Sequence, residues 1–281
     1  MNLFGKITDY KSDFITYART FEKYKWYKPI LITILGIIFF LLLNLLMFIL
    51  FAYINNFVKM DINLETIENN LIVIMIIPSI FLSSKIIKDR PFSSYLNLNN
   101  SWNWKVFFKS FAIALIIILI IEGAQVLFKG GDQFKNTFTI LTFLAILIVT
   151  PLQCFAEELF SRGLFMQTFG SWFKIPILAI IIQGLIFASL HYYNAIGLLN
   201  IFIIGIGYGF IAWYSKGLEI SSAIHTSNNL FVNILEGFTL TTVPYEIPIE
   251  TVIISVLILV VTIITIIFIE KKFKWIGFSS V

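Results

Sequence analysis

The sequence predicts an all-α membrane protein, a polytopic bundle of about eight transmembrane helices. Of its 281 residues, 58% are hydrophobic and 13% are charged, against about 45–50% and about 25% in a typical soluble domain. Long apolar runs recur along the chain, and a helix of about 20 such residues spans a bilayer. These observations exclude a soluble globular enzyme. We therefore expect a multi-pass protein of the cell membrane, in contact with lipids.

Eight segments reach or approach the length that a crossing requires. The first, third, fourth and last meet it clearly, whereas the other four are less regular and contain Pro78, several glycines or many polar side chains. Interrupted helices are tolerated where neighbouring helices cover them, so we expect these four inside the bundle. In chain order, the segments are residues 29–53, 67–84, 106–128, 136–169, 175–191, 198–214, 218–235 and 251–269.

Lysine and arginine positions predict the orientation, because cytoplasmic loops are enriched in these residues. Eight crossings with both termini in the cytoplasm leave Lys59, Lys129 and Lys135 outside and nearly all other cationic residues inside. Seven or nine crossings would instead move the lysines of residues 271–274 outside. We therefore expect a cytoplasmic segment at residues 1–28, a transmembrane bundle at 29–269 and a cytoplasmic tail at 270–281.

Net charge and cysteine content exclude two further kinds of protein. The formal net charge of +4 is small, and the cations cluster near helix ends, so no basic face for nucleic acid is expected. The single cysteine, Cys154, forms neither an intramolecular disulfide nor a cysteine-rich zinc site.

Ionisable side chains inside the apolar segments are the candidates for function, because a charge at the bilayer centre costs at least about 2.5–3.5 kcal/mol on insertion scales. Glu158 and Arg162 have the spacing and order of a helical ion pair. The adjacent Glu157 points about 100° away around the helix. The sequence therefore predicts that Arg162 neutralises Glu158 and leaves Glu157 for chemistry.

Both histidines of the chain also lie in or at the ends of apolar segments. Phe187 precedes His191 by four residues, and His225 precedes Asn229 by four residues, so each pair shares a helix face. Counting from the turn between segments 136–169 and 175–191 places Glu157 and His191 at nearly the same depth, and His225 reaches it if those helices project from the membrane. We expect one site, toward the cytoplasmic side of the membrane.

Two chemistries are open to such a site. A buried glutamate facing an imidazole can deprotonate water, while a second imidazole and an amide NH₂ stabilise the oxyanion of amide hydrolysis. Alternatively, Glu157, His191 and His225 could bind one divalent metal, zinc above all, with water in the open position. The spacing does not decide between no cofactor and one metal ion.

The three motifs together resemble those of the CPBP family, the CAAX proteases and bacteriocin-processing enzymes that include the type II CAAX prenyl endopeptidases. They are Glu157-Glu158-x-x-x-Arg162, Phe187-x-x-x-His191 and His225-x-x-x-Asn229, and the resemblance covers residues 148–235. It implies an eight-helix intramembrane endopeptidase with a protease core at about residues 136–236. It also implies a cavity open to the cytoplasm.

The resemblance implies a role for each motif residue. Glu157 and His191 would activate the water, and His225 and Asn229 would line the oxyanion site. Glu158, Arg162 and Phe187 would support this geometry.

Cofactor and substrate are not settled by the resemblance. Family members have been described as metalloproteases and as glutamate proteases without metal; we favour the glutamate mechanism. The implied substrate is a prenylated CAAX-type peptide or a signalling or bacteriocin-type peptide at the membrane. Two other classes stay open: a non-catalytic bacteriocin self-immunity protein that acts by binding, and an ion-coupled transporter with Glu122, Glu157 and the histidines as a relay.

Overall fold

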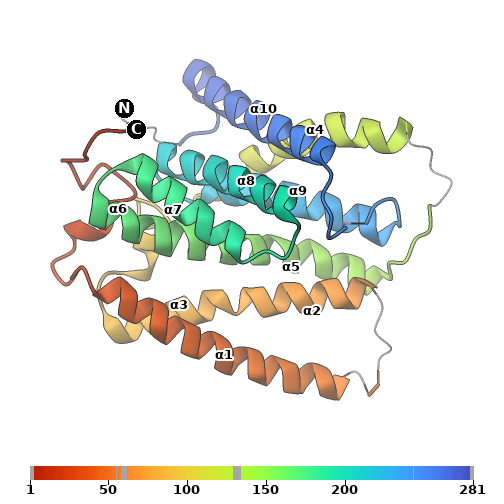
Figure 1. Cartoon of the computed structure of the whole chain (residues 1–281), viewed down its shortest axis with the longest axis horizontal. Coiled ribbons are helices and arrows are strands. Elements are labelled where there is room, and N and C mark those ends of the chain that lie inside the picture. The colour runs from red at the N-terminus through yellow and green to blue at the C-terminus, as the bar shows by residue number, and fades with distance from the viewer. Residues whose placement is uncertain (1–2, 55, 58–61, 129–133, 243, 279–281) are drawn as a thin grey trace.

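The computed structural model describes residues 3–54, 56–57, 62–128, 134–242 and 244–278, and within these ranges the chain is helical and contains no β-strand (Figure 1). The predicted all-α fold class is confirmed, and each of the eight predicted segments is helical. Lys59 and Lys129, which the predicted topology places outside, lie outside the described residues, as do residues 1–2 and 279–281 of the predicted terminal segments.

The helices are, in chain order, η1 (Tyr17–Thr20), α1 (Lys28–Ile54), α2 (Ile62–Ile74), α3 (Ile76–Ile87), η2 (Phe92–Tyr95), α4 (Trp104–Phe128), α5 (Ile140–Glu158), η3 (Leu159–Met166), α6 (Gln167–Phe173), α7 (Pro176–Ser189), α8 (Ala195–Tyr214), α9 (Glu219–Gly237) and α10 (Ile249–Phe273).

Six helices or continuous helix pairs in the described part of the chain are long and apolar enough to cross a membrane. They are α1, α2–α3, α4, the rod from α5 to α6, α8 and α10, so the chain is a multi-pass membrane protein. The other two predicted segments differ: α7 has 14 residues, about 21 Å of helix, and α9 is rich in polar side chains. The number of crossings therefore stays a prediction.

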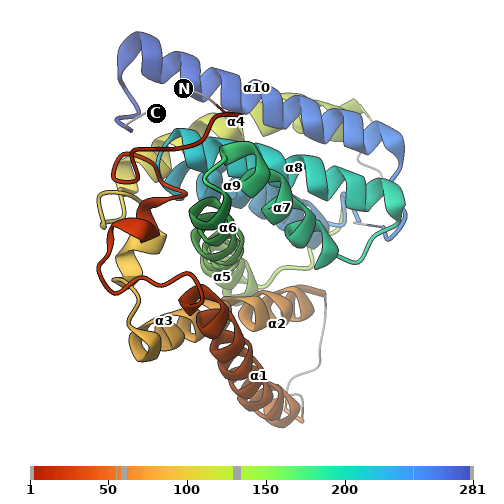
Figure 2. The ribbon, with the colours of Figure 1, turned by 60° about the vertical axis from the view of Figure 1, so that its left-hand side comes forward.

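The helices are arranged around α5 and α9. In Figure 2, α5 and α6 are seen end-on within the bundle and α1 lies at its edge. The polar helix α9 packs against α4, α5 and α8, whereas α1 packs mainly against α3. Polar residues are thus placed at the centre of the bundle and apolar residues at its periphery, as a bilayer requires.

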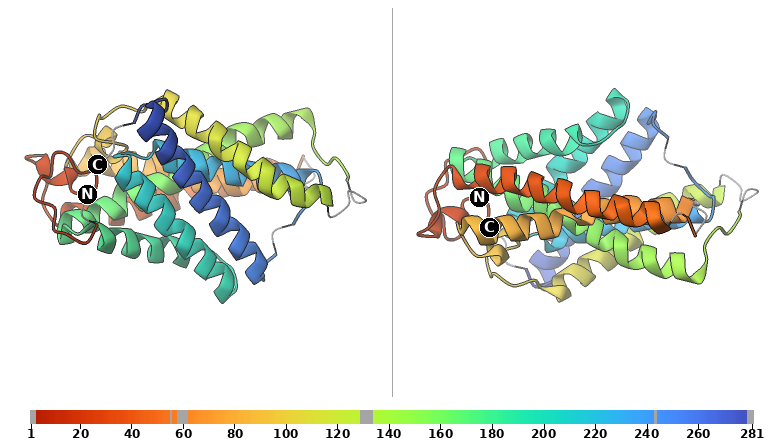
Figure 3. Two further views of the ribbon diagram at one scale, coloured as in Figure 1. Left: turned by 90° about the horizontal axis from the view of Figure 1, so that it is seen from above. Right: turned by 90° about the horizontal axis from the view of Figure 1, so that it is seen from below.

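Both described ends of the chain lie at one end of the bundle (Figure 3). The carbonyl of Leu3 accepts from the backbone N–H of Ile177, and Phe278 packs against Tyr214. We call this the termini end, where α4 and α9 begin and α6, α8 and α10 finish. The opposite end, where α5, α8 and α10 begin and α9 finishes, is called the far end.

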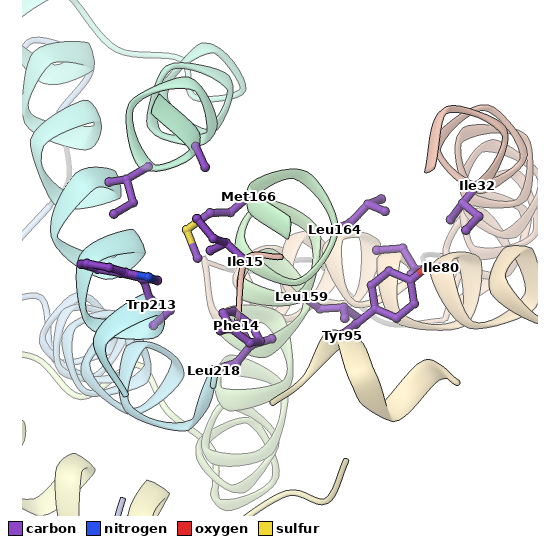
Figure 4. Packing of buried hydrophobic residues seen from close by; sticks show 13 residues of the cluster. Phe14, Ile15, Ile32, Ile80, Tyr95, Leu159, Leu164, Met166, Trp213 and Leu218 are labelled. Carbon is purple, nitrogen blue, oxygen red and sulfur yellow. The ribbon is translucent and has the colours of Figure 1, made fainter. Parts of the chain in front are cut away.

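A buried apolar cluster fills the termini end (Figure 4). We call Phe14, Ile15, Met166, Trp213 and Leu218 the termini cluster; each is at most 1% exposed. The N-terminal segment is held there by the Asp13 carboxylate, which accepts a hydrogen bond from the Trp213 indole at 3.0 Å. Residues before the first helix thereby close this end of the bundle.

The helices α5, η3 and α6 form one rod of 34 residues. It begins with a capping box, in which the side chains of Thr139 and Thr142 each accept a hydrogen bond from the other's backbone N–H. Its middle part, η3, is a π-helix, a geometry that is rare and is found frequently at functional sites. The rod ends at Lys174, whose φ of 62° is left-handed, and Pro176 starts α7. The π-helix follows directly after Glu157 and Glu158.

Candidate functional site

A cavity of about 460 Å³ is lined by the predicted site residues that were expected to contact the substrate. Glu157, Phe187, His191, His225 and Asn229 all line it. The supporting pair lies behind this surface, since the side chains of Glu158 and Arg162 are 0% exposed. The bundle thus brings α5, α7, α8 and α9 together at one cavity.

Glu157 is the partly accessible carboxylate of the glutamate pair. Its side chain is 19% exposed. The Gln153 amide, one turn earlier on α5, donates to Glu157 Oε1 at 2.6 Å, and His225 Nε2 lies 3.5 Å from Glu157 Oε2. A carboxylate held by neighbours and still open to a cavity is suited to accept a proton from water.

His225 lies between the two glutamates. Its Nδ1 is 3.1 Å from Glu158 Oε1, and its Nε2 is 3.3 Å from Asn229 Nδ2. When Nδ1 carries the proton, it donates to Glu158, and Nε2 accepts from the Asn229 amide. Glu158 therefore fixes the orientation of this imidazole.

The predicted ion pair between Glu158 and Arg162 is formed in the interior. Arg162 Nη1 donates to Glu158 Oε1 at 2.9 Å, and Nη2 donates to the Gly205 carbonyl at 3.0 Å. The guanidinium also lies over the Phe187 ring, 4.4 Å from its centroid, and near Tyr208. A buried charge needs both a counter-charge and hydrogen bonds, and α5, η3, α7 and α8 together supply them.

His191 lies just beyond the end of α7 rather than within a helix. Its Nδ1 is 2.8 Å from the Phe187 carbonyl, and its ring packs against Phe187 with centroids 4.8 Å apart. It lines the cavity, but the described contacts of Glu157 are with Gln153 and His225. His225, rather than His191, is thus the imidazole beside Glu157.

The expected metal ligands do not converge. His225 Nδ1 faces Glu158 and His191 Nδ1 faces a backbone carbonyl. Among the described residues, no group of three or more His, Cys, Asp or Glu side chains is arranged to hold a metal ion. Glu157, His191 and His225 therefore do not fit a metal ion in this geometry.

Two further residues complete the site and were missed from the sequence. Gln153 accepts from the Asn229 amide at 3.3 Å and so connects Asn229 to Glu157. Tyr208, buried on α8, packs against His225 with ring centroids 5.2 Å apart. Gln153 carried a signal, because a polar residue one turn before Glu157 shares its helix face. Tyr208 carried none, since an aromatic residue in an apolar helix has no distinguishing pattern.

The lining of the cavity reaches the far end of the bundle, and the expected opening to the cytoplasm stays a prediction. Its outer walls come from Gly197 near the start of α8, Glu236 near the end of α9 and Thr251 near the start of α10. None of the described residues that line it belongs to the termini cluster.

A known protein family matches the part of the chain that carries the three motifs. Residues 137–231 match the sequence model of the type II CAAX prenyl endopeptidase Rce1-like family. The chain is also 29% identical over 175 residues to the uncharacterized protein YyaK of Bacillus subtilis (strain 168), and the match covers 58% of each chain. The chain thus spans less than two thirds of this relative's length. No solved structure matches.

Proposed function

We propose that this chain, whose residues 137–231 form an Rce1-like domain of the CPBP family, is an intramembrane endopeptidase. The observation that carries the proposal is the position of Glu157, a carboxylate that is open to a cavity and lies 3.5 Å from an imidazole. Desolvated carboxyl groups paired with imidazoles are suited to general base catalysis. The substrate class is a peptide at the membrane, of the CAAX, signalling or bacteriocin type.

In the first step, water is activated at Glu157. A carboxylate oxygen takes one proton from the water, and the hydroxide oxygen forms a bond to the carbonyl carbon of the peptide. The electron pair of the carbonyl double bond moves onto its oxygen. The Asn229 amide, which faces the cavity beside His225, turns one N–H from His225 Nε2 to this oxyanion, and His225 lines the same cavity.

In the second step, the tetrahedral intermediate collapses. The carbonyl forms again, the carbon–nitrogen bond breaks, and Glu157 returns its proton to the leaving nitrogen. His191 has its Nδ1 occupied by the Phe187 carbonyl, so its Nε2 is left to hold the water from another wall of the cavity. Glu158 and Arg162 keep His225 in place and are positioning residues.

The test is cleavage of a quenched peptide panel by the purified chain in detergent, comparing wild type with Glu157→Gln. Loss of general base catalysis is expected to lower kcat by about 10²–10⁴-fold while the unfolding temperature stays unchanged. Glu250→Gln is the matched control, because Glu250 is exposed and does not line the cavity. A strong chelator, with and without added zinc, is included as a separate arm.

Each result has one meaning. Cleavage by wild type that is lost in Glu157→Gln and resists the chelator supports the proposed glutamate mechanism. Cleavage that the chelator abolishes and zinc restores contradicts it. Cleavage that survives Glu157→Gln, or bacteriocin protection that survives it in cells, contradicts a peptidase centred on Glu157 and favours a protein that acts by binding.

A further inference from the structure

A second pocket, of about 400 Å³, lies where α1 begins and α3 ends, at the lower left of Figure 1. Its walls come from residues 21–23 before α1, from the last turn and C-cap of α3, and from residues 89–92, which follow α3. We call it the α1–α3 pocket. No described residue lines both this pocket and the cavity that contains Glu157, so it is a separate site.

The α1–α3 pocket has an excess of positive charge. Four cationic side chains line it, against two carboxylates. The carboxylate of Asp89 is buried; it accepts from the Tyr95 hydroxyl at 3.2 Å and lies 3.5 Å from Arg90 Nε. With Asp89 and Arg90 balancing each other, three exposed lysines remain against the exposed Glu22. These lysines are Lys23, Lys85 and Lys88.

Arg90 is the buried cation of this pocket. Its side chain is 2% exposed, its guanidinium lies over the Tyr95 ring at 3.7 Å from the centroid, and its Nη1 donates to Gln167 on α6. Its Nε has no hydrogen-bond partner among the described residues. A guanidinium presents its N–H groups in a planar fork that matches the oxygens of a phosphate. Arg90 is thus held in place and incompletely hydrogen-bonded, as a site for an anion requires.

The α1–α3 pocket lies at the level of the lipid headgroups. One candidate membrane span begins at Lys28 and the next ends at Ile87, and α1 packs against α3. Trp26 and Tyr27, just before α1, are exposed, and such aromatic residues are typical of the membrane–water interface. From the pocket, exposed apolar side chains continue along both helices, among them Ile30, Ile34, Phe81 and Ile86. A ligand with a charged head and apolar chains fits this arrangement.

We propose that the α1–α3 pocket binds the phosphate of an anionic membrane lipid. The phosphate oxygens contact Arg90 and the ammonium groups of Lys23 and Lys88, and the acyl chains lie on the exposed apolar surface of α1 and α3. Basic pockets between membrane helices bind anionic headgroups in this way. A free phosphate would use the same cations but would leave the apolar surface uncovered. The inference goes beyond the proposed function and does not depend on it.

Binding is measured with the purified full chain in an uncharged detergent. The probe is phosphatidylglycerol with a fluorescent acyl chain. Unlabelled phosphatidylglycerol is expected to displace it from wild type, whereas phosphatidylcholine, whose choline cancels the phosphate charge, is expected to displace it weakly. Higher salt is expected to weaken binding of the probe, because the three lysines are exposed.

The exposed lysines provide the deciding variant. Lys23→Gln/Lys88→Gln is expected to weaken binding of the probe about ten-fold and to leave the unfolding temperature unchanged. The matched control is Lys271→Gln/Lys272→Gln, which removes the same charge from the last turn of α10, outside the pocket. This control is expected to bind the probe as wild type does.

Arg90→Lys tests the buried cation. It keeps the positive charge and removes the planar fork, so weaker binding of the probe is expected. Thermal unfolding checks that this variant is folded. The lysine variant decides the inference even where Arg90→Lys does not fold, because Lys23 and Lys88 are exposed.

Three results would overturn the inference. The first is equal displacement of the probe by phosphatidylglycerol and phosphatidylcholine. The second is an equal loss of binding in the lysine variant and its control, which would show attraction by surface charge alone. The third is displacement by millimolar inorganic phosphate, at an ionic strength matched with chloride, which would identify a free phosphate rather than a lipid as the ligand.

Discussion

The helices α1 and α9 differ in the side chains that they expose and bury: α1 exposes apolar side chains, whereas α9 buries polar ones. In α1, most of the large apolar side chains are exposed, and Ile32 is one of its few buried residues. In α9, His225, Thr226 and Ser227 are buried. Lipid covers the apolar helix at no cost, while polar groups must find partners inside the bundle. Hydropathy therefore identifies α1 readily, and it indicates α9, the helix that carries half of the candidate site, much less clearly.

The largest expected effect comes from breaking the buried ion pair that supports α9. Arg162→Met leaves Glu158 charged and uncompensated in the interior, and a loss of about 3–5 kcal/mol in the free energy of unfolding is expected. Denaturant unfolding in detergent measures it. The double variant Glu158→Gln/Arg162→Met removes both charges and is expected to lose less. A double variant at least as unstable as Arg162→Met would contradict the account of Glu158 as an uncompensated charge.

A smaller effect on stability is expected from replacing one glycine in each of the two helices, α9 and α1. At Gly237, the last residue of α9, an added Cβ would lie 2.0 Å from Phe138, so Gly237→Ala is expected to cost about 1–3 kcal/mol. At Gly36 in α1, the nearest atom is Ser83 Oγ at 3.6 Å. Gly36→Ala is expected to be neutral or to stabilise by up to about 1 kcal/mol. Thermal unfolding of the two variants side by side measures the contrast, and equal shifts would contradict it.

The smallest effect concerns a buried polar group outside the membrane-spanning helices. Burial raises the pKa of the Asp13 carboxyl, against the hydrogen bonds from Trp213 and the backbone. A raised folded-state pKa means that Asp13 contributes stability below the ordinary carboxyl pKa near 3.9 and loses it as pH rises through the folded value. The stability of wild type relative to Asp13→Asn is therefore expected to fall as the pH rises above about 4.

The exposed Asp9 provides the control for this pH dependence. Hydrogen bonds from Ser12 and the Lys11 backbone lower the pKa of Asp9, so its contribution is present above the ordinary value and is lost as pH falls. The stability of wild type relative to Asp9→Asn should not decrease as pH rises. Thermal unfolding of both variants across the pH range tests the sign, and a parallel decline in the two differences would refute it.

The fold and part of the site were predictable from the sequence because they depend on local properties. Helix positions follow from apolar length, and the Glu158–Arg162 pair follows from a spacing of four within one helix. The grouping of the motifs at one cavity followed from depth counted along the helices. Positions counted along each helix were therefore enough to predict that Glu157, His191 and His225 line one cavity.

The remaining features depend on how the helices pack, which a periodic pattern does not report. The choice of His225 over His191 as the neighbour of Glu157 depends on α7 ending at Ser189, before His191. Gln153 and Tyr208 become part of the site through contacts with side chains of another helix, α9. Phe14 and Ile15 precede the predicted spans and nevertheless fold back onto them.

The π-helix η3 determines how far α6 is rotated about the axis of the rod relative to α5. Before it, Glu157 and Glu158 face the cavity and its supporting network; after it, Gly170 lies so close to Ile15 that an added Cβ would be 2.5 Å away. Because π-helical hydrogen bonds run from i to i+5, a change of length within Leu159–Met166 alters the angle between α5 and the residues that follow. The contact of Gly170 with the N-terminal segment would then be disturbed even where Glu157, His191, His225 and Asn229 are all present. In evolution, this stretch should therefore keep its length as well as Arg162, while its other side chains change more readily.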